Sequence, residues 1–206
     1  MSRGQVPEEV LLVPGLWMPA AAMALIGARL RREGFRTQSF AYSGRHPLEQ
    51  TLERLAGLVR ERPVHFVGHS LGGVLIFDLL QSHRDIAASR VVLLGSPVRG
   101  CNTGRRLSAG AFGRWMLGCC AERWQEREAR WQRPEALGVI AGTRPLGLGR
   151  LLGALPGEND AVVRTEETVV EGMTDRVLVR QGHSMLIASR DVAGLVARFL
   201  RTGAFR

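Results

Sequence analysis

The 206-residue sequence contains no lysine, so arginine supplies all 28 of its basic residues and the net charge is +9. A basic chain is compatible with a nucleic-acid or an anionic membrane partner. The arginines are scattered, however, with no long basic run and no aromatic-interleaved RNA motif. We therefore expect no nucleic-acid partner, and we interpret the absence of lysine as a codon bias.

Cysteine is scarce, with only Cys101, Cys119 and Cys120. An odd number of cysteines, two of them adjacent, does not make a disulfide framework. No spacing of Cys and His resembles a zinc site. We expect reduced thiols, no metal and no cofactor.

Long apolar runs are also missing, and no stretch of about 18 apolar residues predicts a membrane span. The beginning, MSRGQVPEEVLLVPG, has no apolar core of the signal-peptide kind and carries Glu8 and Glu9. These features predict a cytoplasmic protein.

Short apolar strands alternate with helical segments along the chain, which is typical of a parallel sheet wrapped by helices. The length suits one domain over residues 1–206. The pattern predicts about six mostly parallel strands with helices on both faces. Strands are expected at 10–13, 35–42, 64–67, 91–94, 136–141 and 177–179, and helices at 20–32, 48–59, 71–80 and 192–200.

A long insertion at 99–133 interrupts this order and contains three of the four tryptophans. Long loops in compact domains are usually functional, so we expect a lid or cap here. Met116, Cys120, Trp124 and Trp131 form an apolar stripe within it. Such a stripe could lie on a lipid interface, but packing on its own domain is the favoured interpretation.

The stretch VHFVGHSLGG places a single Ser70 between Gly68 and Gly72, after a predicted strand and before a predicted helix. In open α/β sheets the ligand crevice lies beyond the carboxyl ends of the strands. A G-x-S-x-G turn in this context exposes the serine hydroxyl beside a helix N-terminus. Ser70 is therefore the candidate nucleophile, and a role as a simple N-cap is the alternative.

A serine nucleophile needs a base, and His183 is the best placed. It follows the sixth predicted strand and precedes the last helix, so it lies at the same sheet edge as Ser70. His69 adjoins the serine and is expected to point away from the hydroxyl and line the site. The other histidines are expected at surface or packing positions: His46, His65 and His83.

An orienting acid is expected after the fifth strand. Asp160, in PGENDAVV, is the candidate, although a turn residue without function is the alternative. Glu158 is a fallback, whereas Asp175 precedes the sixth strand at its amino end and faces the wrong edge.

Acyl transfer also requires donors for an oxyanion. In this turn the backbone N–H of Leu71 is one candidate, and that of Leu16, in the loop after the first strand, is the other. Gly15 would let this loop approach closely. Trp17 and Met18 lie beside it and are expected to line an apolar substrate pocket together with His69.

These motifs resemble the α/β-hydrolase fold, and within it the small bacterial lipases and esterases. The matching stretches are VLLVPGLW, GHSLGG, GENDAVV and GHSML, in the family's order of Ser, Asp and His. The resemblance spans Val10 to Leu200 and implies the same roles for Ser70, His183 and Asp160, with Leu16 and Leu71 as oxyanion donors.

Two departures from the family pattern stand out. The oxyanion loop reads Pro14-Gly15 where family members often have His-Gly, so its support is expected to differ. The acid motif reads Asp160-Ala161 where Asp-Gly is common. Because alanine adopts a positive φ only at a cost, the turn is expected to change slightly.

The sequence thus predicts a serine hydrolase that cleaves carboxylic esters with an apolar acyl group. Its expected partner is a small ester or lipid substrate, with peripheral contact with an anionic membrane as a further expectation. The alternatives are an acyl-thioesterase and a non-catalytic hydrolase-like binding protein at a membrane surface.

Overall fold

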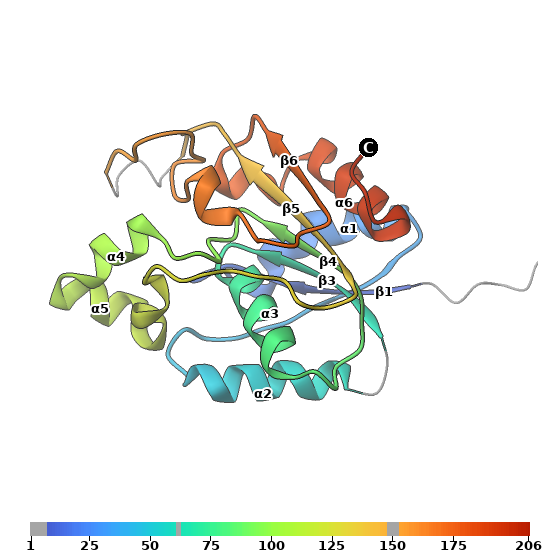
Figure 1. Cartoon of the computed structure of the whole chain (residues 1–206), viewed down its shortest axis with the longest axis horizontal. Helices are drawn as coiled ribbons and strands as arrows, with labels where there is room; N and C mark the ends of the chain where they lie inside the picture. The colour runs from blue at the N-terminus through green and yellow to red at the C-terminus, as the bar shows by residue number, and fades with distance from the viewer. Residues whose placement is uncertain (1–7, 61–62, 148–152) are drawn as a thin grey trace, which may run out of the picture.

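Six parallel strands form one sheet in the computed structural model, which describes residues 8–60, 63–147 and 153–206 (Figure 1). The strand order is β2-β1-β3-β4-β5-β6, and every neighbouring pair is parallel. The prediction of a six-stranded α/β sheet is confirmed. The first seven residues, on which the expectation of no signal peptide partly depends, lie outside the described residues. The strands are β1 Glu9–Val13, β2 Arg36–Ser39, β3 Val64–His69, β4 Ala88–Leu94, β5 Ala136–Gly142 and β6 Asp175–Val179.

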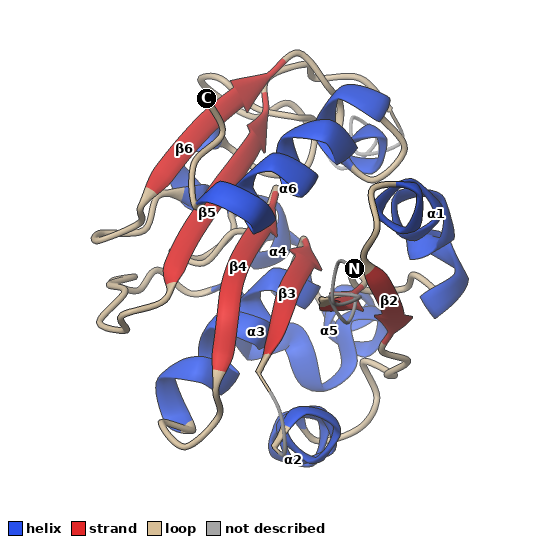
Figure 2. Ribbon diagram, turned by 90° about the vertical axis from the view of Figure 1, so that its right-hand side faces the viewer, coloured by secondary structure: helices blue, strands red, loops and turns tan. Residues whose placement is uncertain are grey.

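Helices cover both faces of this sheet, as Figure 2 shows. Alternate residues of β1 face opposite layers because side chains in a strand alternate. Leu11 and Val13 join the core formed with α2 and α3, whereas Val10 and Leu12 join the core formed with α1 and α6. The helices outside the insertion are α1 Ala24–Arg32, α2 Leu48–Val59, α3 Leu71–Ser82 and α6 Arg190–Thr202. In the described ranges, short 3-10 helices accompany them at η1 Ala20–Met23, η4 Thr165–Thr168 and η5 His183–Leu186.

Element boundaries differ from the predicted ones at the ends. Strand β2 ends at Ser39 rather than at Tyr42, and the helix expected from residue 20 begins as the 3-10 turn η1. Helix α6 is longer than predicted because Ser189 caps its first turn and Gly203 ends it in a left-handed conformation. Among the described residues, no helix combines the length and apolar character needed to cross a bilayer.

The insertion after β4 folds into α4 Asn102–Ser108, α5 Ala111–Leu117 and the 3-10 helix η2 Gly118–Trp124. Figure 1 shows α4 and α5 at the outer end of the molecule, beyond the sheet. Cys120, Trp124 and Trp131 are buried and Met116 is half-buried, so most of the apolar stripe packs on its own domain as expected. A lid function for this segment stays a prediction.

Candidate active site

Ser70 occupies the turn between β3 and α3. Its φ of 53° lies in the left-handed region, which is strained for any residue other than glycine. The Ser70 N–H donates to the carbonyl of Leu94 at 2.9 Å, which ties the turn to the neighbouring strand β4. The hydroxyl makes no capping hydrogen bond with α3, so the alternative role as an N-cap finds no support.

The two glycines around Ser70 are required by close backbone approaches. A Cβ added at Gly72 would lie 2.2 Å from the carbonyl oxygen of Val13, and one added at Gly68 would lie 2.4 Å from the Cα of Gly73. Both distances are too short for any side chain. The turn is therefore pressed against the end of β1 and against the first turn of α3, which fixes the place of the serine.

His183 and Asp160 form a buried pair at the same edge of the sheet. His183 Nδ1 lies 2.7 Å from Asp160 Oδ2, and the two residues are 9% and 1% exposed. Because a carboxylate can only accept, the ring proton is assigned to Nδ1, and Nε2 is left as an acceptor. This is the tautomer that a general base requires.

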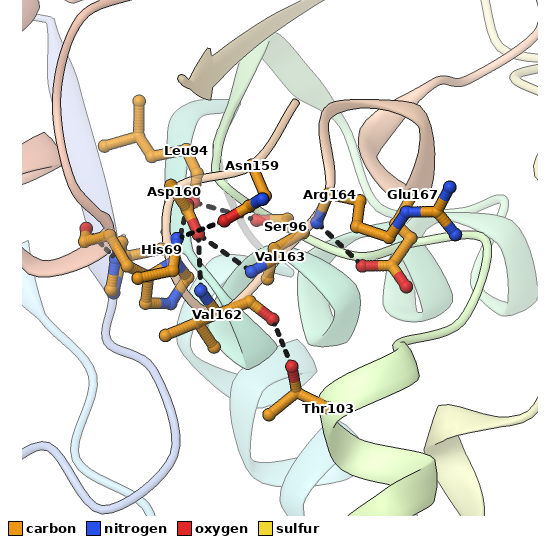
Figure 3. A network of polar contacts seen from close by, with 12 residues as sticks. His69, Leu94, Ser96, Thr103, Asn159, Asp160, Val162, Val163, Arg164 and Glu167 are labelled. Carbon is orange, nitrogen blue, oxygen red and sulfur yellow. Dashed lines mark hydrogen bonds and ion pairs between the residues drawn. The ribbon is translucent and has the colours of Figure 1, made fainter. Parts of the chain in front are cut away.

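Backbone groups hold Asp160 in place, as Figure 3 shows. Its Oδ1 accepts from the N–H groups of Val162 at 3.0 Å and Val163 at 2.8 Å. The N–H of His183 donates to the Asp160 carbonyl at 3.0 Å. One carboxylate thus closes its own turn with one oxygen and orients the imidazole with the other.

The acid turn was expected to change slightly because Ala161 stands where the family often has glycine, but Ala161 keeps a glycine-like backbone conformation. Its φ is 84°, so this alanine adopts the conformation that glycine favours. A left-handed residue costs roughly 1–2 kcal/mol. Asn159 Oδ1 accepts from the Ala161 N–H at 3.0 Å, and with the two bonds to Asp160 Oδ1 this offsets the strain.

The loop after β1 lies directly against the serine. A Cβ added at Gly15 would be 3.1 Å from the Cβ of Ser70. The Tyr42 hydroxyl donates to the Pro14 carbonyl at 2.9 Å, and burial raises the pKa of this phenol above its ordinary value, so it stays a donor. Tyr42 therefore supplies the altered support expected for a loop that begins with Pro14.

The oxyanion roles of Leu16 and Leu71 stay predictions. Leu71 begins α3 directly after Ser70, and Leu16 lines the same cavity as Ser70. Both backbone N–H groups therefore belong to segments that meet at the nucleophile.

An apolar cavity of about 380 Å³ opens on these residues. Ser70, His183, His69 and the predicted pocket residues Trp17 and Met18 all line it. The insertion supplies much of the opposite wall, through Thr103, Gly104, Leu107, Leu117 and Trp124. A larger cavity of about 510 Å³ lies on the far side of α4, is lined mainly by charged side chains and contains none of the three candidate catalytic residues.

Hydrogen bonds attach this wall to the acid turn. The Thr103 hydroxyl donates to the Val162 carbonyl at 2.7 Å. Buried Glu167 accepts from the N–H groups of Asn102 at 2.6 Å and Arg164 at 2.8 Å, and burial raises its pKa. The first turn of α4 is therefore held at a fixed place relative to Asp160.

His69 supports the base rather than the nucleophile. It is buried, and its Nε2 lies 3.0 Å from the His183 carbonyl oxygen, with the two ring centroids 4.6 Å apart. Burial lowers the pKa of His69 to about 3, and electrostatic repulsion from the neighbouring His183 ring adds to the shift. A neutral His69 donates to the His183 backbone and braces the loop that carries the base.

This burial predicts a loss of stability in acid. Below pH 6.5 His69 becomes protonated in the unfolded chain, whereas in the folded protein it stays neutral down to about pH 3. The contribution of His69 to the free energy of unfolding should therefore fall as the pH drops through this window. In His69→Gln, whose amide keeps a donor near the Nε2 position, urea unfolding should show a shallower pH dependence. An unchanged slope would contradict the assignment.

Two further residues that contribute to the site, Gly95 and Tyr42, were not predicted from the sequence. Gly95, with a φ of 52°, lies behind the acid–base pair, since a Cβ there would be 3.1 Å from Asp160 Oδ2 and 2.7 Å from Leu186 Cδ1. The other is Tyr42. The GSP that follows β4 was a usable signal for Gly95, whereas nothing local marked Tyr42. No group of three metal-ligating side chains occurs in the described part of the chain.

Comparisons with known proteins identify the family of the chain. A family model described as the alpha/beta hydrolase family matches residues 10–203. No curated protein matches the sequence.

Among solved structures, a Bacillus licheniformis lipase in its propeptide form superposes with a TM-score of 0.73 at 18% identity, over 88% of this chain and 47% of the lipase chain. A thermophilic esterase from Thermogutta terrifontis gives 0.66 at 16% identity, over 96% and 91% of the two chains. The type II thioesterase of the borrelidin biosynthetic cluster gives 0.62 at 19% identity, over 95% and 92%. At these identities the likeness shows a shared fold.

Proposed function

Because the chain belongs to the alpha/beta hydrolase family, we propose that it cleaves carboxylic esters with an apolar acyl group, with Ser70 as nucleophile. The observation that carries this proposal is the 2.7 Å contact between His183 Nδ1 and Asp160 Oδ2 in a cavity that Ser70 also lines. A buried carboxylate beside an imidazole, next to a serine on a strained turn, is the arrangement that activates a hydroxyl.

The proposed reaction proceeds in two halves. His183 Nε2 takes the Ser70 proton while the hydroxyl oxygen attacks the ester carbonyl carbon, and the same nitrogen then protonates the departing alkoxide. An acyl-serine remains. Water attacks this ester, loses its proton to His183, and releases the acid as Ser70 recovers its proton. Asp160 stabilises the imidazolium in both halves.

The negative oxygen of each tetrahedral intermediate would accept hydrogen bonds from the backbone N–H groups of Leu16 and Leu71. Both are backbone donors on segments fixed by packing, so they need no reorganisation during the reaction. Removing one such donor in a comparable site costs roughly 10²–10³ in kcat.

The apolar wall of the cavity supports an apolar acyl group. The same serine, imidazole and carboxylate could also cleave a thioester, because His183 would face the leaving group in either substrate. An acyl-thioesterase is therefore the second candidate. Paired substrates decide between them: p-nitrophenyl esters from acetyl to long acyl chains, and the matching acyl-thioesters. We expect hydrolysis, with an initial burst of p-nitrophenol as the acyl-serine accumulates. A folded protein that cleaves neither series would favour a non-catalytic binding protein.

Leu107 provides a direct test of the acyl cavity. It lies half-buried on α4 and lines the wall of the cavity. Leu107→Trp should fill part of that space and lower kcat/KM for the longest accepted acyl chain about tenfold or more, with the acetyl ester nearly unaffected. Leu58→Ala on α2 is a control away from the cavity. An equal loss for short and long chains would place the acyl group elsewhere.

A further inference from the structure

Three exposed aromatic side chains gather beside the active-site cavity. Trp17, Phe112 and Trp115 are 57%, 72% and 61% exposed. Phe112 and Trp115 stack on one side of α5 with ring centroids 5.9 Å apart. The Trp17 indole donates to the Met116 carbonyl at 3.0 Å, which attaches it to the same helix. We call these three side chains the aromatic platform.

Helix α5, which carries two of the three platform residues, packs closely against α4. A Cβ at Gly113 would lie 1.8 Å from the Leu107 carbonyl oxygen, so α5 meets α4 in close contact there. Arg114 Nη1 donates to the carbonyls of Ser108 at 3.0 Å and Ala109 at 3.1 Å, at the end of α4. One side of α5 is therefore buried, and the aromatic side is held outward. Exposed apolar patches of this kind mark interaction sites.

The surroundings of the platform are basic. The guanidinium of Arg45 lies over the Trp115 ring, 5.1 Å from its centroid, and Arg106 and Arg114 are exposed on α4 and α5. The sequence contains no Asp or Glu in residues 34–48 or 86–121. The segments that build this end of the molecule thus carry positive charge without acidic neighbours in sequence.

We propose that the chain docks on an anionic lipid surface through the aromatic platform. Tryptophan and arginine suit the headgroup region, where rings meet apolar chains and guanidinium groups meet phosphates. Helices α4 and α5 project at the outer end of the molecule (Figure 1). Trp17 belongs to the platform and also lines the cavity, so docking brings the cavity next to the lipid. This docking is independent of the proposed hydrolysis.

Vesicle co-sedimentation tests the proposal, with Ser70→Ala protein so that no lipid is cleaved. We expect binding to vesicles of phosphatidylglycerol in phosphatidylcholine, weakened by added salt, and little binding to phosphatidylcholine alone. Adding Phe112→Ala and Trp115→Ala together should weaken binding about tenfold or more. Arg45→Gln should weaken it roughly fivefold. The matched controls Leu58→Ala and Arg198→Gln, on α2 and α6, should bind as the parent protein does.

Three results would overturn the proposal. One is equal binding to vesicles with and without phosphatidylglycerol. Another is unchanged binding by the Phe112→Ala/Trp115→Ala protein. The third is a concentration-dependent dimer that this double variant abolishes, since a second copy would then cover the platform. With Ser70 present, the double variant should keep its kcat/KM for a soluble acetyl ester, so failed docking and failed hydrolysis remain distinguishable.

Discussion

Replacing Ser70 with alanine is expected to lower kcat for a p-nitrophenyl ester by roughly 10⁴–10⁶. The change removes the only atom that forms the acyl-enzyme bond in the proposed reaction. It leaves the Cβ in place, and the hydroxyl does not cap α3, so the turn should keep its structure. Initial rates measure the loss, and thermal unfolding by circular dichroism should give a Tm within a few degrees of wild type.

Ser184→Ala is the matched control, because Ser184 lines the same cavity next to His183. It should retain activity within about threefold. If Ser70→Ala kept more than a tenth of the wild-type rate, another residue would be the nucleophile and the proposed mechanism would be wrong.

Asp160→Asn should cost about 10⁴ in kcat with little loss of stability. The amide oxygen can still accept from Val162 and Val163, so the turn is preserved. The amide NH₂ would then face His183 Nδ1 and donate to it. That bond moves the ring proton to Nε2, where the imidazole can no longer accept the proton of Ser70.

Asp175→Asn controls for the loss of a carboxylate elsewhere. Asp175 accepts from the Phe205 N–H at 2.7 Å at the opposite edge of the sheet, so its variant should retain nearly full activity. Near wild-type activity in Asp160→Asn would assign the acid to another carboxylate, with Glu158 two residues away as the first candidate.

Features carried by short stretches of sequence were predictable. The apolar run before GHSLGG and the apolar helix after it defined the strand, the turn and Ser70 together. The positions of His183 and Asp160 followed from chain order, because both come after strands whose carboxyl ends share one edge of the sheet with β3. The structure brings them to 2.7 Å although 23 residues separate them.

Features set by long-range packing were not predictable. The positive φ of Ala161 depends on acceptors from Asn159 and Asp160 that only the folded turn provides. The Tyr42 hydroxyl donates to the Pro14 carbonyl although the two residues are 28 positions apart in the sequence, and no local sequence pattern predicts this contact. His69 was expected to line the site, and it does, but its hydrogen bond to the His183 backbone depends on the meeting of two loops.

Covalent labelling tests the central claim most directly. Wild-type protein treated with a fluorophosphonate should gain the mass of one adduct, and peptide mapping should locate it on Ser70. The His183→Ala variant should be labelled far more slowly, because the Ser70 hydroxyl would lack a base to remove its proton. Absence of an adduct on folded wild-type protein, or an adduct on any residue other than Ser70, would contradict the account.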